Sequence, residues 1–81
     1  MVQGQIRQLD PAKRFAVILL NDGREVAVTF PAEANIEVLE PATMGTKGGV
    51  LEDLEVGYWV EAELHEQGGN GCSCSSLISI S

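Results

Sequence analysis

The sequence predicts a small all-β domain, built from five short antiparallel strands that close into one barrel. Three observations lead to this prediction. Apolar and polar residues alternate over short stretches, which is typical of strands with one buried face. Glycine, proline, asparagine and aspartate gather between those stretches, where turns need them. The chain has 81 residues, enough for one small domain and no more.

The centre of the sequence is a predicted hairpin over residues 14–30, RFAVILLNDGREVAVTF. Residues 15–20 form an apolar run rich in residues that favour strands. A helix is the competing interpretation, but six residues are few for a helix. The Asn-Asp-Gly that follows suits a hairpin turn, because glycine tolerates positive φ. Residues 25–30 then alternate, and Pro31 ends the ladder because it has no N–H to donate.

The first strand of this hairpin is apolar on both faces, whereas a strand in a one-sided sheet should alternate. Either the chain covers the second face itself, or that face is an exposed apolar surface that binds something. The two faces are Ala16, Ile18 and Leu20 on one side, and Phe15, Val17 and Leu19 on the other.

A further strand is predicted before the hairpin, over residues 2–9. Gly4 and Ile6 share a face, and Leu9 breaks the alternation, which indicates a bulge or the end of the strand. Residues 10–13, Asp-Pro-Ala-Lys, form a turn, since aspartate suits its first position and proline its second. The first three strands therefore make an antiparallel meander.

The connection that follows is predicted to hold little regular structure. Residues 31–35 could form one helical turn, and residues 36–39 are too few for more than a strand extension. Residues 41–49, PATMGTKGG, are predicted to be a flexible loop, and their spacing does not match a phosphate-binding loop. A short helical turn then seats Leu51 and Leu54 on the core.

The last two strands are predicted to form a second hairpin. In the first of them Val60, Ala62 and Leu64 share the inner face, and Trp59 lies on the outer face, as a cover for the barrel end or an anchor for a partner. A glycine-rich loop over residues 67–71 follows. The last strand places one set of residues together on a face: Cys72, Cys74, Ser76, Ile78 and Ile80.

Five strands with this layout match the outline of the OB-fold, a partly open five-stranded barrel; an open, sandwich-like sheet is the alternative. No linker or internal repeat divides the chain, so residues 1–81 are expected to be a single domain. No apolar run approaches the ~20 residues of a transmembrane helix, and the start of the chain lacks the layout of a signal peptide. We therefore expect a cytoplasmic protein.

The formal net charge is −7, and it is unevenly spread. Residues 1–30 carry four cations against three acids, a net of +1, whereas residues 31–81 carry one cation against nine acids, a net of −8. An acidic molecule repels polyanions at long range, which counts against nucleic acid. The cations flank the central hairpin, however, and this asymmetry softens the objection.

Much of the sequence resembles bacterial cold-shock domains. Residues 4–18, GQIRQLDPAKRFAVI, are similar to the family opening G-x-V-K-W-F-N-x-x-K-G-F-G-F-I. Residues 26–30, VAVTF, resemble V-F-V-H-F, and residues 56–64, VGYWVEAEL, resemble E-G-x-x-V-x-F-E-V. Residues 21–26, NDGREV, are also similar to related OB domains of translation initiation factors and ribosomal S-type repeats. The resemblance covers most of the chain apart from residues 31–53.

This resemblance implies an OB barrel that binds single-stranded RNA or DNA by stacking bases on aromatic side chains over a basic groove. The sequence departs from the family at its aromatic positions. The family's tryptophan is Gln8 here, its second phenylalanine of the second strand is Val17, and the phenylalanine and histidine of its third strand are Ala27 and Thr29. The candidate nucleic-acid-binding residues are Arg7, Lys13, Arg14, Phe15, Val17, Arg24 and Phe30.

Two other functions stay open at this point. The face formed by Phe15, Val17, Leu19 and Ala27 could dock a protein partner or a second copy of the chain. A metal site could use Cys72, Cys74 and His65, although a structural zinc site needs four ligands and core packing of the cysteines is the simpler reading. No nucleophile–base pair or complete ligand set is visible, so we expect neither an enzyme nor a cofactor.

Overall fold

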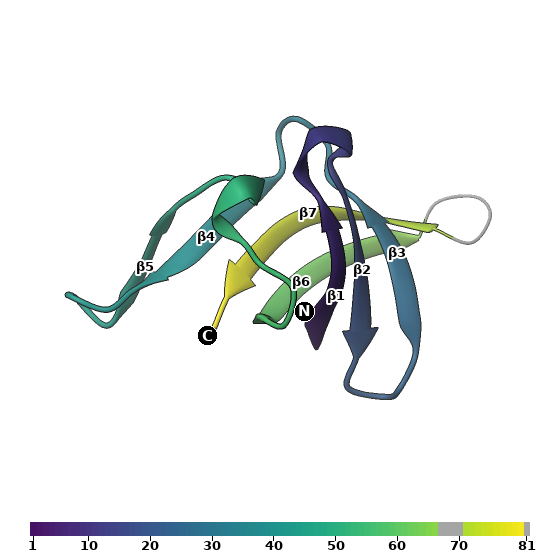
Figure 1. The fold of residues 1–81 in the computed structure, drawn as a ribbon, viewed down its shortest axis with the longest axis horizontal. Helices are drawn as coiled ribbons and strands as arrows, with labels where there is room; N and C mark the ends of the chain where they lie inside the picture. The colour runs from purple at the N-terminus through teal and green to yellow at the C-terminus, as the bar shows by residue number, and fades with distance from the viewer. Residues whose placement is uncertain (67–70, 81) are drawn as a thin grey trace.

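The computed structural model describes residues 1–66 and 71–80, and in them the chain is mostly strand (Figure 1). Two short 3-10 turns, η1 and η2, interrupt the strands. Among the described residues no helical segment has the length and apolar character needed to cross a bilayer. The elements are β1 (Val2–Asp10), η1 (Pro11–Lys13), β2 (Phe15–Leu20), β3 (Glu25–Thr29), β4 (Asn35–Glu40), β5 (Gly45–Gly48), η2 (Leu51–Asp53), β6 (Trp59–Glu66) and β7 (Gly71–Ser79).

Five of the strands close into a barrel, which confirms the predicted fold class. The sheet order is β3-β2-β1-β6-β7, and a further pairing between β3 and β7 completes the circle. Four of the five contacts are antiparallel, as predicted, but β3 and β7 run parallel, with Val28 opposite Cys72. A closed barrel removes the unpaired strand edges that an open sheet would expose.

The core of the barrel is formed by the inward-facing residues of every barrel strand. The predicted inner face of β2 is confirmed, since Ala16, Ile18 and Leu20 are all buried. η2 also behaves as predicted, because it presents Leu51 and its C-cap residue Leu54 to the core. The buried apolar set is Ile6, Ala16, Ile18, Leu20, Val28, Phe30, Ile36, Leu51, Leu54, Val60, Ala62, Cys74 and Leu77.

Two β-bulges interrupt the alternation of the strands. In β1, Ile6 pairs with Ile18 and Gln8 with Val17, so Arg7 is the extra residue and Leu9 returns to the core. The sequence pattern breaks at Leu9 because β1 contains a bulge, whose extra residue, Arg7, lies two positions earlier.

The second bulge corrects the faces predicted for the last strand. In β7, Ser76 pairs with Glu63 and Cys74 with Leu64, which leaves Ser75 as the extra residue. Cys74 and Leu77 both point inward as a result, and the residues beyond the bulge exchange faces relative to the prediction.

The connection between β3 and β6 differs most from the prediction. Residues 31–34 form a simple turn, in which the N–H of Ala34 donates to the carbonyl of Pro31 at 3.0 Å, and not a helical turn. The predicted flexible loop contains β5, which pairs with β4 in an antiparallel hairpin that projects from the barrel (Figure 1). β4 also pairs in parallel with β7, and this long-range contact has no local sequence signal. Most of the predicted loop over residues 67–71 lies outside the described residues.

Gly4 provides a stability test of the barrel wall. A Cβ atom at this position would lie 2.5 Å from the Leu19 carbonyl oxygen and 2.7 Å from Ile18 Cγ2, so backbone would have to move. We expect Gly4→Ala to lower the free energy of unfolding by about 1–3 kcal/mol, the usual cost of overpacking. Gly48→Ala is the matched control, because a Cβ there meets nothing within 4 Å. Equal urea midpoints for the two variants would contradict this account of the wall.

Candidate nucleic-acid interface

The outer face of β2 carries the apolar residues that the sequence left without a cover. Phe15, Val17 and Leu19 are each half-buried, so this face is neither closed over nor fully open. Val17 lies between Gln8 of β1 and Ala27 of β3, its partners in the two neighbouring strands. The face is therefore a shallow apolar strip, with polar side chains of β1 along one border.

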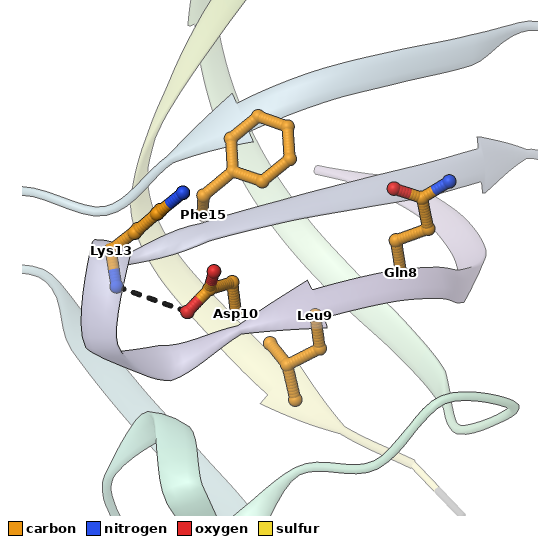
Figure 2. Close-up of a pocket in the computed structure, with 5 residues that line it drawn as sticks. All are labelled: Gln8, Leu9, Asp10, Lys13 and Phe15. Atoms are coloured by element: carbon orange, nitrogen blue, oxygen red, sulfur yellow. Dashed lines mark hydrogen bonds between the residues drawn. The ribbon is translucent and has the colours of Figure 1, made fainter.

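A hollow of about 480 Å³ opens at one end of this strip, beside η1. Figure 2 shows the ring of Phe15, the ammonium group of Lys13 and the amide of Gln8 on the same side of the β1–β2 hairpin. The pairing of Asp10 with Phe15 brings the Asp10 carboxylate to the same place. The residues that line the hollow are Gln8, Leu9, Asp10, Lys13 and Phe15.

The shape of the β1–β2 connection follows from its sequence. Asp10 caps η1, since its carboxylate accepts a hydrogen bond from the Lys13 backbone N–H at 3.2 Å. Pro11 is the first residue of the turn, where a missing N–H costs nothing. Arg14 ends the turn with a left-handed φ of 51°, which turns the chain back into β2. This tight connection holds Lys13 next to Phe15.

Arg14 has a structural role that the sequence analysis did not anticipate. Its Nε donates to the Phe30 carbonyl at 2.7 Å, and its Nη2 donates to the Pro31 carbonyl at 2.9 Å. In return, the Phe30 N–H donates to the Arg14 carbonyl at 2.9 Å. The guanidinium group therefore fixes the end of β3, and Arg14 is not among the residues that line the hollow.

Phe30 also does not lie on the candidate surface. Its side chain is 2% exposed and belongs to the core, so no base can stack on it. The alternation of the sequence contained this information, because Phe30 is two residues after the buried Val28. Phe15 is the one candidate aromatic side chain that reaches the outer face.

The two other predicted arginines lie opposite carboxylates. Arg7 Nε is 3.9 Å from Glu25 Oε2, and Arg24 Nε is 2.8 Å from Asp22 Oδ2. Hydrogen bonds from the backbone N–H of Arg24, and then from its side chain, lower the pKa of Asp22. Both pairs are exposed to solvent, so each contributes little to stability.

The predicted residues therefore divide into three groups, of which the first, Arg14 and Phe30, serves the fold. Lys13 and Phe15 meet at the hollow, with Val17 beside them. Arg7 lies part way along β1, and Arg24 follows the turn at the far end of the β2–β3 hairpin. Gln8 and Asp10 also line the hollow. The sequence does not predict them as binding residues: Gln8 stands where the cold-shock family has tryptophan, and Asp10 is predicted only as a turn residue. Their common location depends on the β1–β2 register.

The structure separates the residues considered for a metal site. Cys74 is buried, its thiol donates to the Ser76 carbonyl at 3.1 Å, and burial raises its pKa to about 11. His65 is exposed, with Nε2 3.0 Å from Ser75 Oγ. Over residues 1–66 and 71–80, no cluster of three potential ligands among histidine, cysteine, aspartate and glutamate is present. The cysteines pack as core residues here, with Cys72 partly buried against the same core.

The role of Arg14 can be tested against that of its neighbour Lys13. Arg14→Ala leaves the carbonyls of Phe30 and Pro31 without their charged donor. We expect a loss of ~1.5–3 kcal/mol in the free energy of unfolding, as for other hydrogen bonds to charged groups. Lys13→Ala, at an exposed position, should change it by less than ~0.5 kcal/mol. Chemical denaturation followed by circular dichroism measures both, and equal effects would refute the structural assignment of Arg14.

Comparison with known proteins does not assign a family: no protein-family model matches the sequence, and no curated protein matches it. The likeness to cold-shock domains therefore remains an expectation drawn from the sequence, and the function has to be argued from the geometry of the candidate interface.

Proposed function

We propose that this protein is a non-enzymatic, cytoplasmic binding module of the OB-fold class that binds single-stranded RNA or DNA with modest affinity. The observation that supports this most directly is the half-exposed ring of Phe15, which stands beside Lys13 at the hollow next to η1 (Figure 2). A flat aromatic face next to a cation is the arrangement that a stacked base and its phosphate require.

The connectivity of the barrel supports this proposal. A meander of three strands, a long connection and a final hairpin that returns to the third strand is consistent with the partly open Greek-key barrel of OB-folds. In that class, oligonucleotides bind on the face of the second and third strands and on the connection between the first and second. Here these positions correspond to β2, β3 and η1, and the hollow lies beside η1, where β1 ends and β2 begins.

The side chains around the hollow suit one nucleobase. A base stacked on Phe15 would gain ~1–3 kcal/mol. The Gln8 amide can both donate to and accept from a base edge, and the Asp10 carboxylate can accept from an exocyclic amino group. Single-stranded nucleic acid presents these edges freely, because its bases are not paired. The volume of about 480 Å³ lies within the range of small-ligand pockets.

The same features set the expected strength of binding. One aromatic side chain provides one stacking site, where a platform of several would add more. The net charge of −7 opposes the approach of a polyanion, although most of the acids lie in residues 31–81 and not on β1 to β3. We therefore expect weak affinity with a strong dependence on salt.

Oligonucleotide titration tests this function. We expect a fluorescein-labelled single-stranded RNA or DNA to bind at low salt and to dissociate as salt rises, because phosphate contacts release counterions. Phe15→Ala should weaken binding by about 5–150-fold, which corresponds to one lost stacking contact. Lys13→Gln should lower the salt dependence by about one phosphate contact. Fluorescence anisotropy at two salt concentrations measures both effects.

Lys47→Gln is the matched control for Lys13→Gln, because Lys47 lies on β5 in the projecting hairpin. It removes the same charge, and this variant should bind the oligonucleotide with the affinity of the wild-type protein. No binding even at low salt would end the nucleic-acid proposal, since the phosphate term is largest there.

A second candidate function uses the apolar strip itself. Phe15, Val17 and Leu19 lie in line along β2, and Ala27 of β3 is directly opposite Val17. An apolar strip on a sheet face is also suited to a protein partner or a second copy of the chain. This function would not require Gln8 or Lys13.

Self-association through this strip is open to a direct test. If the strip is a dimer interface, Val17→Glu should convert a dimer to a monomer, because it buries an unpaired charge. Size-exclusion chromatography with light scattering measures the mass over a range of concentrations. Ala32→Glu, at an exposed position in the turn before β4, adds the same charge elsewhere and should leave the mass unchanged. A wild-type monomer at all concentrations would rule out self-association.

A further inference from the structure

A second surface of this protein depends on the bulge in β7. Ser75 is the extra residue of that bulge, so the side chains beyond it change faces. Leu77 is buried, whereas Ile78 is half-buried on the outside and Ile80 is 43% exposed. Without the bulge, the alternation that begins at Cys74 would direct both isoleucines into the barrel.

The outward isoleucines lie next to an exposed tryptophan. The N–H of Ile80 donates to the carbonyl of Trp59 at 2.9 Å, which makes these two residues neighbours across β6 and β7. Trp59 is 47% exposed, the only tryptophan of the chain. Ile78 continues the apolar surface along β7. An exposed tryptophan within an apolar surface is a frequent anchor of protein interfaces.

Carboxylates border this apolar surface on two sides. Ile78 pairs with Glu61 of β6 and with Glu37 of β4, so one acid lies on each neighbouring strand. At the usual spacing of strands, the backbones of the two acids are about 10 Å apart.

The carboxylate of Glu37 is held in place by its neighbours. It accepts hydrogen bonds from Thr46 Oγ1 at 2.6 Å and from Asn35 Nδ2 at 3.0 Å. Glu61 Oε1 lies 3.5 Å from Gln3 Nε2. We name this set the Trp59 face: Glu37, Trp59, Glu61, Ile78 and Ile80.

We propose that the Trp59 face docks a basic protein segment, in which an apolar side chain is flanked by arginine or lysine on both sides. The apolar side chain would pack on Trp59 and Ile80, and the flanking cations would pair with Glu37 and Glu61. Arginine is well suited to this role, because its planar group binds carboxylates through two hydrogen bonds.

The charge of the Trp59 face favours a basic segment over a second copy of the chain or a nucleic acid. A second copy docked through the same face would bring two sets of Glu37 and Glu61 together, in a chain whose net charge is −7. A nucleic acid would meet the same repulsion. A cationic segment is attracted by both carboxylates and by the net charge of the molecule.

The Trp59 face and the hollow at Phe15 lie on different walls of the barrel. In the closed order β3-β2-β1-β6-β7, strand β6 is opposite the β2–β3 pair. A partner on β6 and β7 would therefore leave the outer face of β2 open. Occupation of one surface does not exclude occupation of the other.

Fluorescence anisotropy of a labelled seven-residue peptide, Gly-Arg-Ser-Leu-Ser-Arg-Gly, tests this proposal on the full chain. We expect saturable binding at about 0.05 M salt that weakens at about 0.3 M, where screening is stronger. Trp59→Ala should weaken binding by ~30-fold or more, as for an interface hot spot. Glu61→Gln should weaken it by about 2–5-fold, the range for an exposed ion pair. Since Trp59 is the only tryptophan, its emission should also shift to the blue on binding.

The controls separate this docking from general attraction of a basic peptide. Glu33→Gln, in the exposed turn after β3, removes the same charge as Glu61→Gln and should leave the affinity unchanged. Peptides with serine in place of leucine, or with glutamate in place of both arginines, should bind at least tenfold more weakly. Circular dichroism confirms that each variant is folded.

Three results would overturn the proposal. The first is no binding of the arginine–leucine peptide at low salt. The second is an equal loss of affinity in Glu33→Gln and Glu61→Gln, which would indicate attraction by net charge alone. The third is a concentration-dependent dimer that Trp59→Glu abolishes, because this would assign the face to a second copy. A failed oligonucleotide titration leaves this test unaffected.

Discussion

The parallel pairing of β3 with β7 is the contact on which the rest of this structure depends. It joins Ala27, Val28 and Thr29 to residues 71–73, which lie more than forty positions later in the chain. Without it, the strands would form one open sheet with unpaired edges at β3 and β5. With it, the inner faces of all five strands enclose one core, and Val28 is fully buried at the joint. The same closure determines which faces remain outside and can bind a partner.

The two bulges determine what those outer faces present. The bulge at Arg7 returns Leu9 to the core and leaves Gln8 outside, at the border of the hollow. The bulge at Ser75 places Ile78 and Ile80 outside, next to Trp59. A one-residue insertion in a strand reverses every later side chain, because the side-chain period of a strand is two. Both candidate binding surfaces therefore originate from local breaks in regular pairing.

The distribution of charge separates the two surfaces. Four of the five cations lie in residues 1–30, on or beside β1, β2 and β3, and nine of the twelve acids lie in residues 31–81. Arg14 and Arg24 show that a cation predicted from the sequence to bind a ligand need not serve the candidate site. Arg14 binds backbone carbonyls of Phe30 and Pro31, and Arg24 binds the neighbouring Asp22. A count of basic residues in the sequence therefore overestimates the charge that a ligand would meet at the hollow.

The sequence by itself determined the local features of this protein. Alternation predicted β1, β3, β6 and β7, and an apolar run predicted β2. The turn residues predicted the hairpin around Gly23 and the turn over residues 10–13, because these features depend on near neighbours in the chain. The local sequence also determines that Lys13 lies next to Phe15, since only Arg14 separates them at the end of a tight turn. Only the tertiary structure decided that β3 pairs with β7, that the predicted loop over residues 41–49 holds a strand, and that Phe30 and the Arg14 side chain serve the fold. The reason is that strand pairing, bulge position and burial are set by contacts between distant segments, whose free energy no local pattern contains.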